Sequence, residues 1–180
     1  NIISQVMTNE NVLALLPELY WPGTVLAILY MFAYGGVLYV LRGESGRYRT
    51  SGTLLLISGV ISVVMLLASS ANAFAVIVSL AASVIVFIAE YQEYMGHAEV
   101  LAGADSYLAD RWRGLWRWMI YAFAASIGGA LAALLFVQAA FLALLFLLVS
   151  VAGMIALLVL GILKLVYLWR TARVFRELAG

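Results

Sequence analysis

The chain has 180 residues, of which 66% are hydrophobic and 11% are charged, with a mean hydropathy of +1.08 and a formal net charge of +1. Soluble domains are about half apolar and about a quarter charged, so this composition indicates an integral membrane protein without a sizeable soluble domain. The chain has no cysteine, which excludes disulfides, thiolate nucleophiles and cysteine-ligated metal centres.

The apolar runs predict an all-α fold, a polytopic bundle of five transmembrane helices, because about 20 apolar residues cross the hydrocarbon of a bilayer. Pro17 and Pro22 separate an external N-terminal segment, residues 1–20, from the first run. Two later runs have twice the length of one span, so each must turn back. The polar stretch SSANA at 69–73 predicts the first of these turns, and Gln138 predicts the second. The predicted spans are residues 22–42, 51–70, 73–92, 115–137 and 139–165.

The basic residues predict the orientation, because short cytoplasmic loops collect Lys and Arg. With five alternating spans, all ten cations fall on one side, and the opposite side carries only Glu10 and Glu18. We therefore expect an external N-terminus and a cytoplasmic C-terminus in a prokaryotic plasma membrane. An external N-terminus would also suit removal of a leader peptide.

Residues 93–114 and 166–180 are predicted to extend helices into the cytoplasm. Gly103 is expected to stop one helix in the left-handed conformation, and Asp105 is expected to cap the next. The segments EVLAG at 99–103 and RELAG at 176–180 each end a predicted helical hairpin. Their similarity is either chance or the trace of a tandem repeat that relates spans two and three to spans four and five.

The segment DRWRGLWRW, residues 110–118, combines three arginines with three tryptophans where the fourth span meets the cytoplasm. An indole suits the membrane interface, and an arginine can bury its stem while its guanidinium reaches lipid phosphates. We assign the segment to an interfacial belt, with a specific anionic lipid or an acidic protein as sharper alternatives. Nucleic acid is not expected, because seven cytoplasmic carboxylates offset a small basic surface. The residues assigned to the lipid interface are Arg111, Trp112, Arg113, Trp116, Arg117 and Trp118.

Small residues at every fourth position predict where helices pack, because close approach stabilises helix contacts in lipid. Such rows occur in the third and fourth spans. Packing within the five-helix bundle is favoured over a dimer interface or a substrate cavity. The residues assigned to helix packing are Ala125, Gly129, Ala133, Ser79 and Ser83.

Glu90, Glu93 and His97 recur at helical spacing before Gly103 and so share one helix face. A carboxylate and an imidazole one turn apart can share a metal ion, but a metal site needs three or four ligands. The chain offers one histidine and no cysteine. A solvated polar face is therefore favoured, no cofactor is expected, and these three residues remain the candidates for a metal.

The spans contain no central charge, and the chain lacks the G-x-S-x-G, H-E-x-x-H and phosphate-loop signatures. These features favour a non-enzymatic membrane subunit, a scaffold, assembly or accessory component that contacts lipids and other membrane subunits or its own copies. The first alternative is a small oligomeric channel or transporter for a neutral solute. The second is a membrane enzyme with a carboxylate and histidine metal site.

Overall fold

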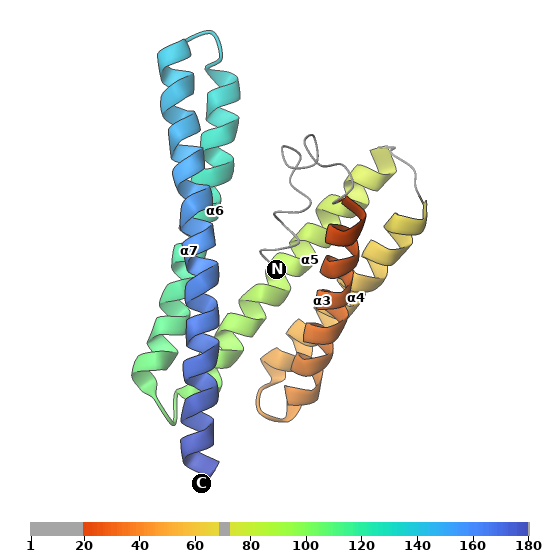
Figure 1. Ribbon diagram of the computed structural model, residues 1–180, viewed down its shortest axis with the longest axis vertical. Helices are drawn as coiled ribbons and strands as arrows, with labels where there is room; N and C mark the ends of the chain where they lie inside the picture. Colours follow the sequence, from red (N-terminus) through yellow and green to blue (C-terminus); the bar gives the residue numbers. More distant parts are fainter. Residues whose placement is uncertain (1–19, 69–72, 180) are drawn as a thin grey trace. The chain divides into compact units, whose positions relative to one another are not determined.

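The computed structural model describes residues 20–68 and 73–179, and the described residues form helices and short turns without a strand (Figure 1). The five long helices are each long and apolar enough to cross a membrane, which confirms the predicted all-α, five-span class. Residues 1–19 of the predicted external segment and residues 69–72 of the predicted first turn lie outside the described residues. The helices are α3 Tyr20–Val40, η2 Leu41–Gly43, α4 Gly46–Ala68, α5 Ala73–Leu101, α6 Ser106–Leu135 and α7 Ala140–Ala179.

The chain divides into two compact units, unit 1 from Asn1 to Val100 and unit 2 from Leu101 to Gly180. Unit 1 contains α3, α4 and nearly all of α5, and unit 2 contains α6 and α7. The most extensive helix pairs are α3 with α4 and α6 with α7. The orientation in the membrane and the tandem repeat stay predictions.

In unit 1, α3 and α4 form an antiparallel hairpin that turns through η2. Glycine permits their close approach, since a Cβ added to Gly52 would lie 2.7 Å from the carbonyl oxygen of Gly35 and from the amide nitrogen of Tyr39. Helix α5 joins the end of this hairpin where η2 lies, with the Ser51 hydroxyl donating to the carbonyl oxygen of Ala89 at 2.8 Å. The apolar core at this junction contains Leu38, Tyr48, Leu55 and Ala89.

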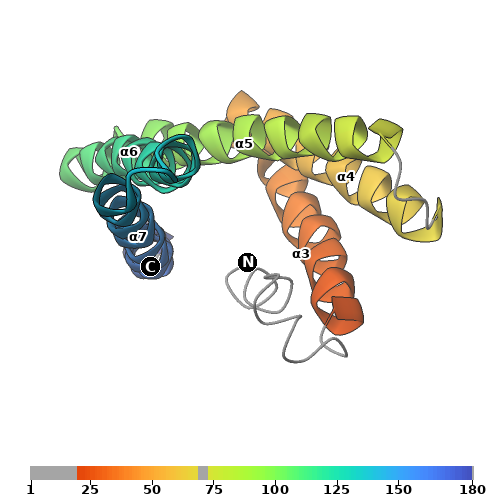
Figure 2. The ribbon, with the colours of Figure 1, turned by 90° about the horizontal axis from the view of Figure 1, so that it is seen from above.

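In unit 2, α6 and α7 lie side by side as an antiparallel hairpin (Figures 1 and 2). A Ser-x-x-Gly pair on each helix forms the closest contact. A Cβ added to Gly129 would lie 2.7 Å from the backbone nitrogen of Ser150, and one added to Gly153 would lie 2.5 Å from the backbone nitrogen of Ser126. The Ser150 hydroxyl donates to the carbonyl oxygen of Ser126 at 2.7 Å. Backbone contact therefore joins these two helices where any larger side chain would separate them.

The turns of unit 2 follow from local chemistry. Asp105 has an extended backbone and its carboxylate accepts from the amide of Leu108 at 2.9 Å, so Asp105 caps α6 as predicted. The prediction that Gly103 adopts the left-handed conformation is wrong, because its φ lies outside that region. The turn closes instead when the amides of Ala104 and Asp105 donate to the carbonyl oxygen of Leu101 at 3.0 and 2.8 Å. Gln138 lies in the turn at 136–139 that separates α6 from α7.

Candidate functional site

The strongest candidate site is a polar cluster in unit 1, which we call the Glu93–His97 cluster and define as Tyr34, Tyr48, Glu93 and His97. Tyr34 is half-buried and the other three residues are buried. Glu93 is 1% exposed and His97 is 6% exposed. Both residues lie on α5 at i and i+4, so the helix presents them on one face. Burial of a carboxylate and an imidazole is costly unless the protein supplies hydrogen bonds to them.

Each member of the α5 pair bonds to a tyrosine from another helix. The Tyr34 hydroxyl on α3 donates to Glu93 Oε1 at 2.7 Å. The Tyr48 hydroxyl on α4 shares a hydrogen bond of 2.7 Å with His97 Nδ1. His97 Nε2 lies 3.8 Å from Glu93 Oε1, which is longer than a hydrogen bond, so two adjacent but separate tyrosine bonds link α5 to α3 and to α4.

Gly96 permits this geometry. A Cβ at Gly96 would lie 2.9 Å from a ring carbon of Tyr48, so the absence of a side chain lets the Tyr48 ring lie against α5. The Tyr48 and His97 ring centroids are 5.2 Å apart in an edge-to-face arrangement. The ring of Tyr34 stacks on Tyr30, with centroids 5.2 Å apart. Ring contacts therefore orient both tyrosine hydroxyls toward α5.

A second polar group covers the end of unit 1, and we call it the outer polar layer, defined as Ser45, Arg47, Gln92 and Glu99. Arg47 Nε donates to Glu99 Oε2 at 3.1 Å, and Arg47 Nη1 donates to Gln92 Oε1 at 3.0 Å. The Ser45 hydroxyl donates to Glu99 Oε2 at 3.1 Å. The Arg47 and Glu99 side chains are 40% and 59% exposed, so this ion pair lies at the surface, whereas Glu93 and His97 are buried.

The predicted metal candidates are only partly brought together. Glu93 and His97 meet, whereas Glu90 lies half-buried almost one turn earlier on α5. Within residues 20–68 and 73–179, no three His, Cys, Asp or Glu side chains group closely enough to hold a metal ion. The solvated polar face that we favoured for Glu93 and His97 is wrong, because both side chains are buried and bond to tyrosines of other helices. Sequence analysis did not pair either tyrosine with Glu93 or His97, and Gly96 beside His97 was the available signal of a close neighbour.

The predicted lipid-interface residues divide into buried and exposed sets. Trp112 is 0% exposed and donates from Nε1 to the Thr171 hydroxyl at 3.2 Å, and its ring meets Tyr167 edge to face. Trp116 is also buried. The position of Trp112 thus differs from the lipid-facing one we expected, because a hydroxyl on α7 satisfies its indole N–H. Of this set, the residues exposed at the surface are Arg111, Arg113, Arg117 and Trp118.

The predicted packing residues also divide. Gly129 is buried against α7, and Ala125 and Ala133 are half-buried. Ser79 and Ser83 are exposed on α5, where the Ser83 hydroxyl donates to the carbonyl oxygen of Ser79 at 2.9 Å. The structure also identifies Ser126, Ser150 and Gly153 as packing residues that the fourfold spacing did not single out.

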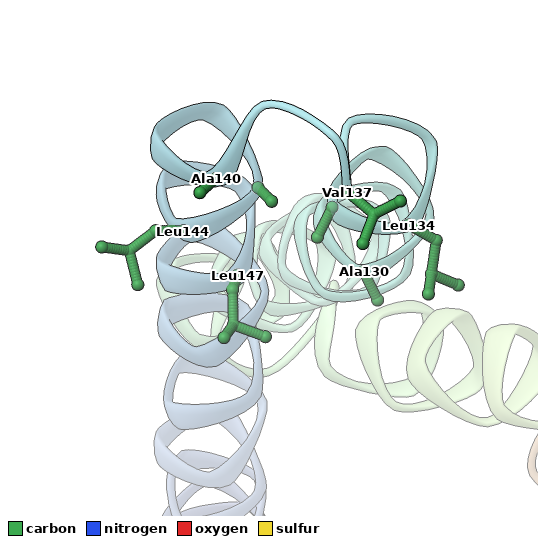
Figure 3. Close-up of a pocket in the computed structure, with 8 residues that line it drawn as sticks. Ala130, Leu134, Val137, Ala140, Leu144 and Leu147 are labelled. Atoms are coloured by element: carbon green, nitrogen blue, oxygen red, sulfur yellow. The ribbon is translucent and has the colours of Figure 1, made fainter.

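An open apolar pocket of about 580 Å³ lies between α6 and α7 beside the 136–139 turn (Figure 3). Every lining residue is alanine, leucine or valine, so the pocket supplies no group for acid, base or metal chemistry. Its lining residues are Ala130, Ala133, Leu134, Val137, Ala140, Ala143, Leu144 and Leu147.

No protein family, curated protein or solved structure matches this chain.

Proposed function

We propose that this multi-pass membrane protein is a non-enzymatic subunit, a scaffold or accessory component that associates with other membrane subunits or with its own copies. Two of its buried ionisable side chains, Glu93 and His97, form hydrogen bonds with other helices of the same chain, and this observation is the main support for the proposal. Glu93 bonds to Tyr34 on α3, and His97 bonds to Tyr48 on α4.

These bonds suit a structural role because they join three helices through one face of α5. A hydrogen bond to a charged group contributes about 1.5–3 kcal/mol, and loss of one partner leaves a buried polar group unsatisfied. The Glu93–His97 cluster therefore favours one arrangement of α3, α4 and α5. A fixed arrangement is what a subunit needs to present a constant surface to a partner.

The exposed small residues of α5 support association as the mode of action. Ser79 and Ser83 lie one turn apart and are exposed, so a second helix can approach the α5 backbone there. Ala81 is also exposed on α5. It lies two positions before Ser83, and two positions correspond to about 200° of rotation around a helix, so Ala81 and Ser83 lie on opposite sides of α5. The same substitution at Ser83 and at Ala81 therefore tests whether association depends on the face of α5 that carries Ser79 and Ser83.

The experiment extracts the tagged full chain from its source membranes in mild detergent, then measures copurifying proteins and oligomeric state by mass spectrometry. We expect a stoichiometric partner or a defined homo-oligomer. Ser83→Leu should disrupt it, because the larger side chain prevents close approach, whereas Ala81→Leu should leave it intact. A monomer without partners, or equal effects of the two substitutions, would contradict the proposal.

Two measurements distinguish the alternative functions. Purified protein in liposomes that conducts a neutral solute would indicate a channel or transporter instead. Stoichiometric metal that disappears in His97→Ala would indicate the enzyme alternative. The subunit proposal expects neither result.

A further inference from the structure

The two units differ in charge as well as in architecture. Unit 1 carries three cations and six carboxylates, a net charge of −3. Unit 2 carries seven cations and three carboxylates, a net charge of +4. The whole chain has a net charge of only +1, but unit 2 by itself is a strongly basic helical hairpin.

Only part of this basic charge is neutralised within unit 2. Arg113 pairs with Asp110 at 2.7 Å, and Arg173 pairs with Glu177 at 2.8 Å. Four exposed arginines form no ion pair with any carboxylate of the described residues. These four are Arg111, Arg117, Arg170 and Arg176.

Contacts between α6 and α7 place two of these arginines at one level of the hairpin. Trp112 on α6 contacts Tyr167 and Thr171 on α7. Arg111 adjoins Trp112 in sequence, and Arg170 lies between the two α7 contacts. The backbones of Arg111 and Arg170 therefore lie at the same level although they belong to different helices.

Arg111 is positioned by a tyrosine. Both its Nε and an Nη nitrogen donate to the Tyr107 hydroxyl, and its guanidinium carbon lies 4.9 Å from the Tyr107 ring centroid. A held guanidinium loses less conformational freedom when it binds an anion.

Exposed aromatic rings accompany the arginines on both helices. Trp169 precedes Arg170 and is 66% exposed, and Trp118 follows Arg117 and is 65% exposed. Arg117 lies six residues after Arg111, which corresponds to about 9 Å along α6. Tryptophan concentrates at the headgroup level of membranes, so these rings place the arginines beside lipid phosphates.

We propose that this end of unit 2 binds the phosphate headgroup of an anionic phospholipid, with Arg111 and Arg170 as its principal ligands. Arginine presents two parallel N–H donors that match phosphate oxygens. We place Trp169 in the headgroup region beside Arg170, and Trp118 with Arg117 nearly two turns further along α6. The site requires no protein partner and so stands independently of the proposed subunit function.

Unit 1 supplies a matched control for the test. Arg42 donates to the Tyr39 hydroxyl at 2.9 Å, and its guanidinium carbon also lies 4.9 Å from a tyrosine ring centroid. Arg49 is exposed like Arg170. The variant Arg42→Gln/Arg49→Gln therefore removes the same charge as Arg111→Gln/Arg170→Gln from a unit that is acidic overall.

The experiment measures lipid retention by native mass spectrometry on full-length protein supplied with phosphatidylglycerol, phosphatidylcholine or inorganic phosphate at fixed ionic strength. We expect the native chain to retain phosphatidylglycerol selectively. Each arginine near an anionic surface contributes about fivefold, so Arg111→Gln/Arg170→Gln should weaken binding about 25-fold. The control variant should change it less than twofold.

Three results would overturn the proposal. The first is equal retention of phosphatidylglycerol and phosphatidylcholine by the native chain. The second is equal loss in the two double variants, which would indicate general charge attraction. The third is displacement of the lipid by inorganic phosphate at comparable concentration, which would indicate a site for a free anion.

Discussion

Unit 1 and unit 2 both contain an antiparallel hairpin in which glycines bring two backbones together, but only unit 1 attaches a third helix. Unit 2 joins α6 to α7 through Gly129 and Gly153. Unit 1 adds α5 through polar side chains, above all Tyr34 and Tyr48 bonding to Glu93 and His97. In both hairpins small residues let two backbones approach closely, whereas the third helix of unit 1 is attached mainly by hydrogen bonds between side chains far apart in the sequence.

The largest expected effect concerns the side of the membrane that each turn faces. We expect a cysteine at Glu44, next to η2 of unit 1, to react only from the cytoplasm, and a cysteine at Gln138 in unit 2 to react only from outside. The chain has no cysteine of its own, so each single-cysteine variant reports one site when labelled with a membrane-impermeant maleimide in intact and opened cells. Labelling of both positions from one side would contradict the five-span orientation.

The next largest effect is expected at the α6–α7 contact of unit 2. Gly129→Ala should destabilise the protein by about 3 kcal/mol, because the new methyl meets backbone atoms that have no free space to move into. The neighbouring Gly128 has nothing within 4 Å of an added Cβ. Gly128→Ala should therefore be neutral or stabilise by up to about 1 kcal/mol. Reversible unfolding in mixed micelles measures both, and similar values would show that this contact does not hold the hairpin together.

A smaller effect is expected for the hydrogen bond between Trp112 and Thr171. Trp112→Phe should cost about 1 kcal/mol of unfolding free energy beyond the effect of ring size. Thr171→Val should cost a similar amount in the native chain and little in the Trp112→Phe background, because the bond is already absent there. Additive losses in the same unfolding assay would mean that the two side chains act independently. The exposed Trp118 provides the control, with a loss of less than about 0.5 kcal/mol for Trp118→Phe.

Local patterns in the sequence predicted most of the fold. The apolar runs predicted five helices, Asp105 predicted the start of α6, and Gln138 lies in the turn between α6 and α7. Each of these features depends on composition or on residues within one helical turn. The conformation of Gly103 was mispredicted because backbone amides close that turn without a left-handed residue.

The candidate site was less predictable because its bonds join distant residues. Helical spacing placed Glu93 and His97 on one face, but Tyr34 lies 59 residues from Glu93 and Tyr48 lies 49 residues from His97. A tyrosine in an apolar helix has no local pattern that names its partner. For the same reason the sequence did not reveal that Trp112 faces Thr171, 59 residues away.

A double-mutant cycle on Tyr34 and Glu93 tests most directly whether hydrogen bonds between side chains attach α5 to the α3–α4 hairpin. Tyr34→Phe, Glu93→Leu and the double variant are compared by unfolding in mixed micelles, with Arg47→Gln and Glu99→Gln as the exposed control pair. We predict a coupling energy of about 2 kcal/mol for Tyr34 and Glu93 and about 0.5 kcal/mol for the exposed pair. A coupling for Tyr34 and Glu93 no larger than that of the exposed pair would contradict the account.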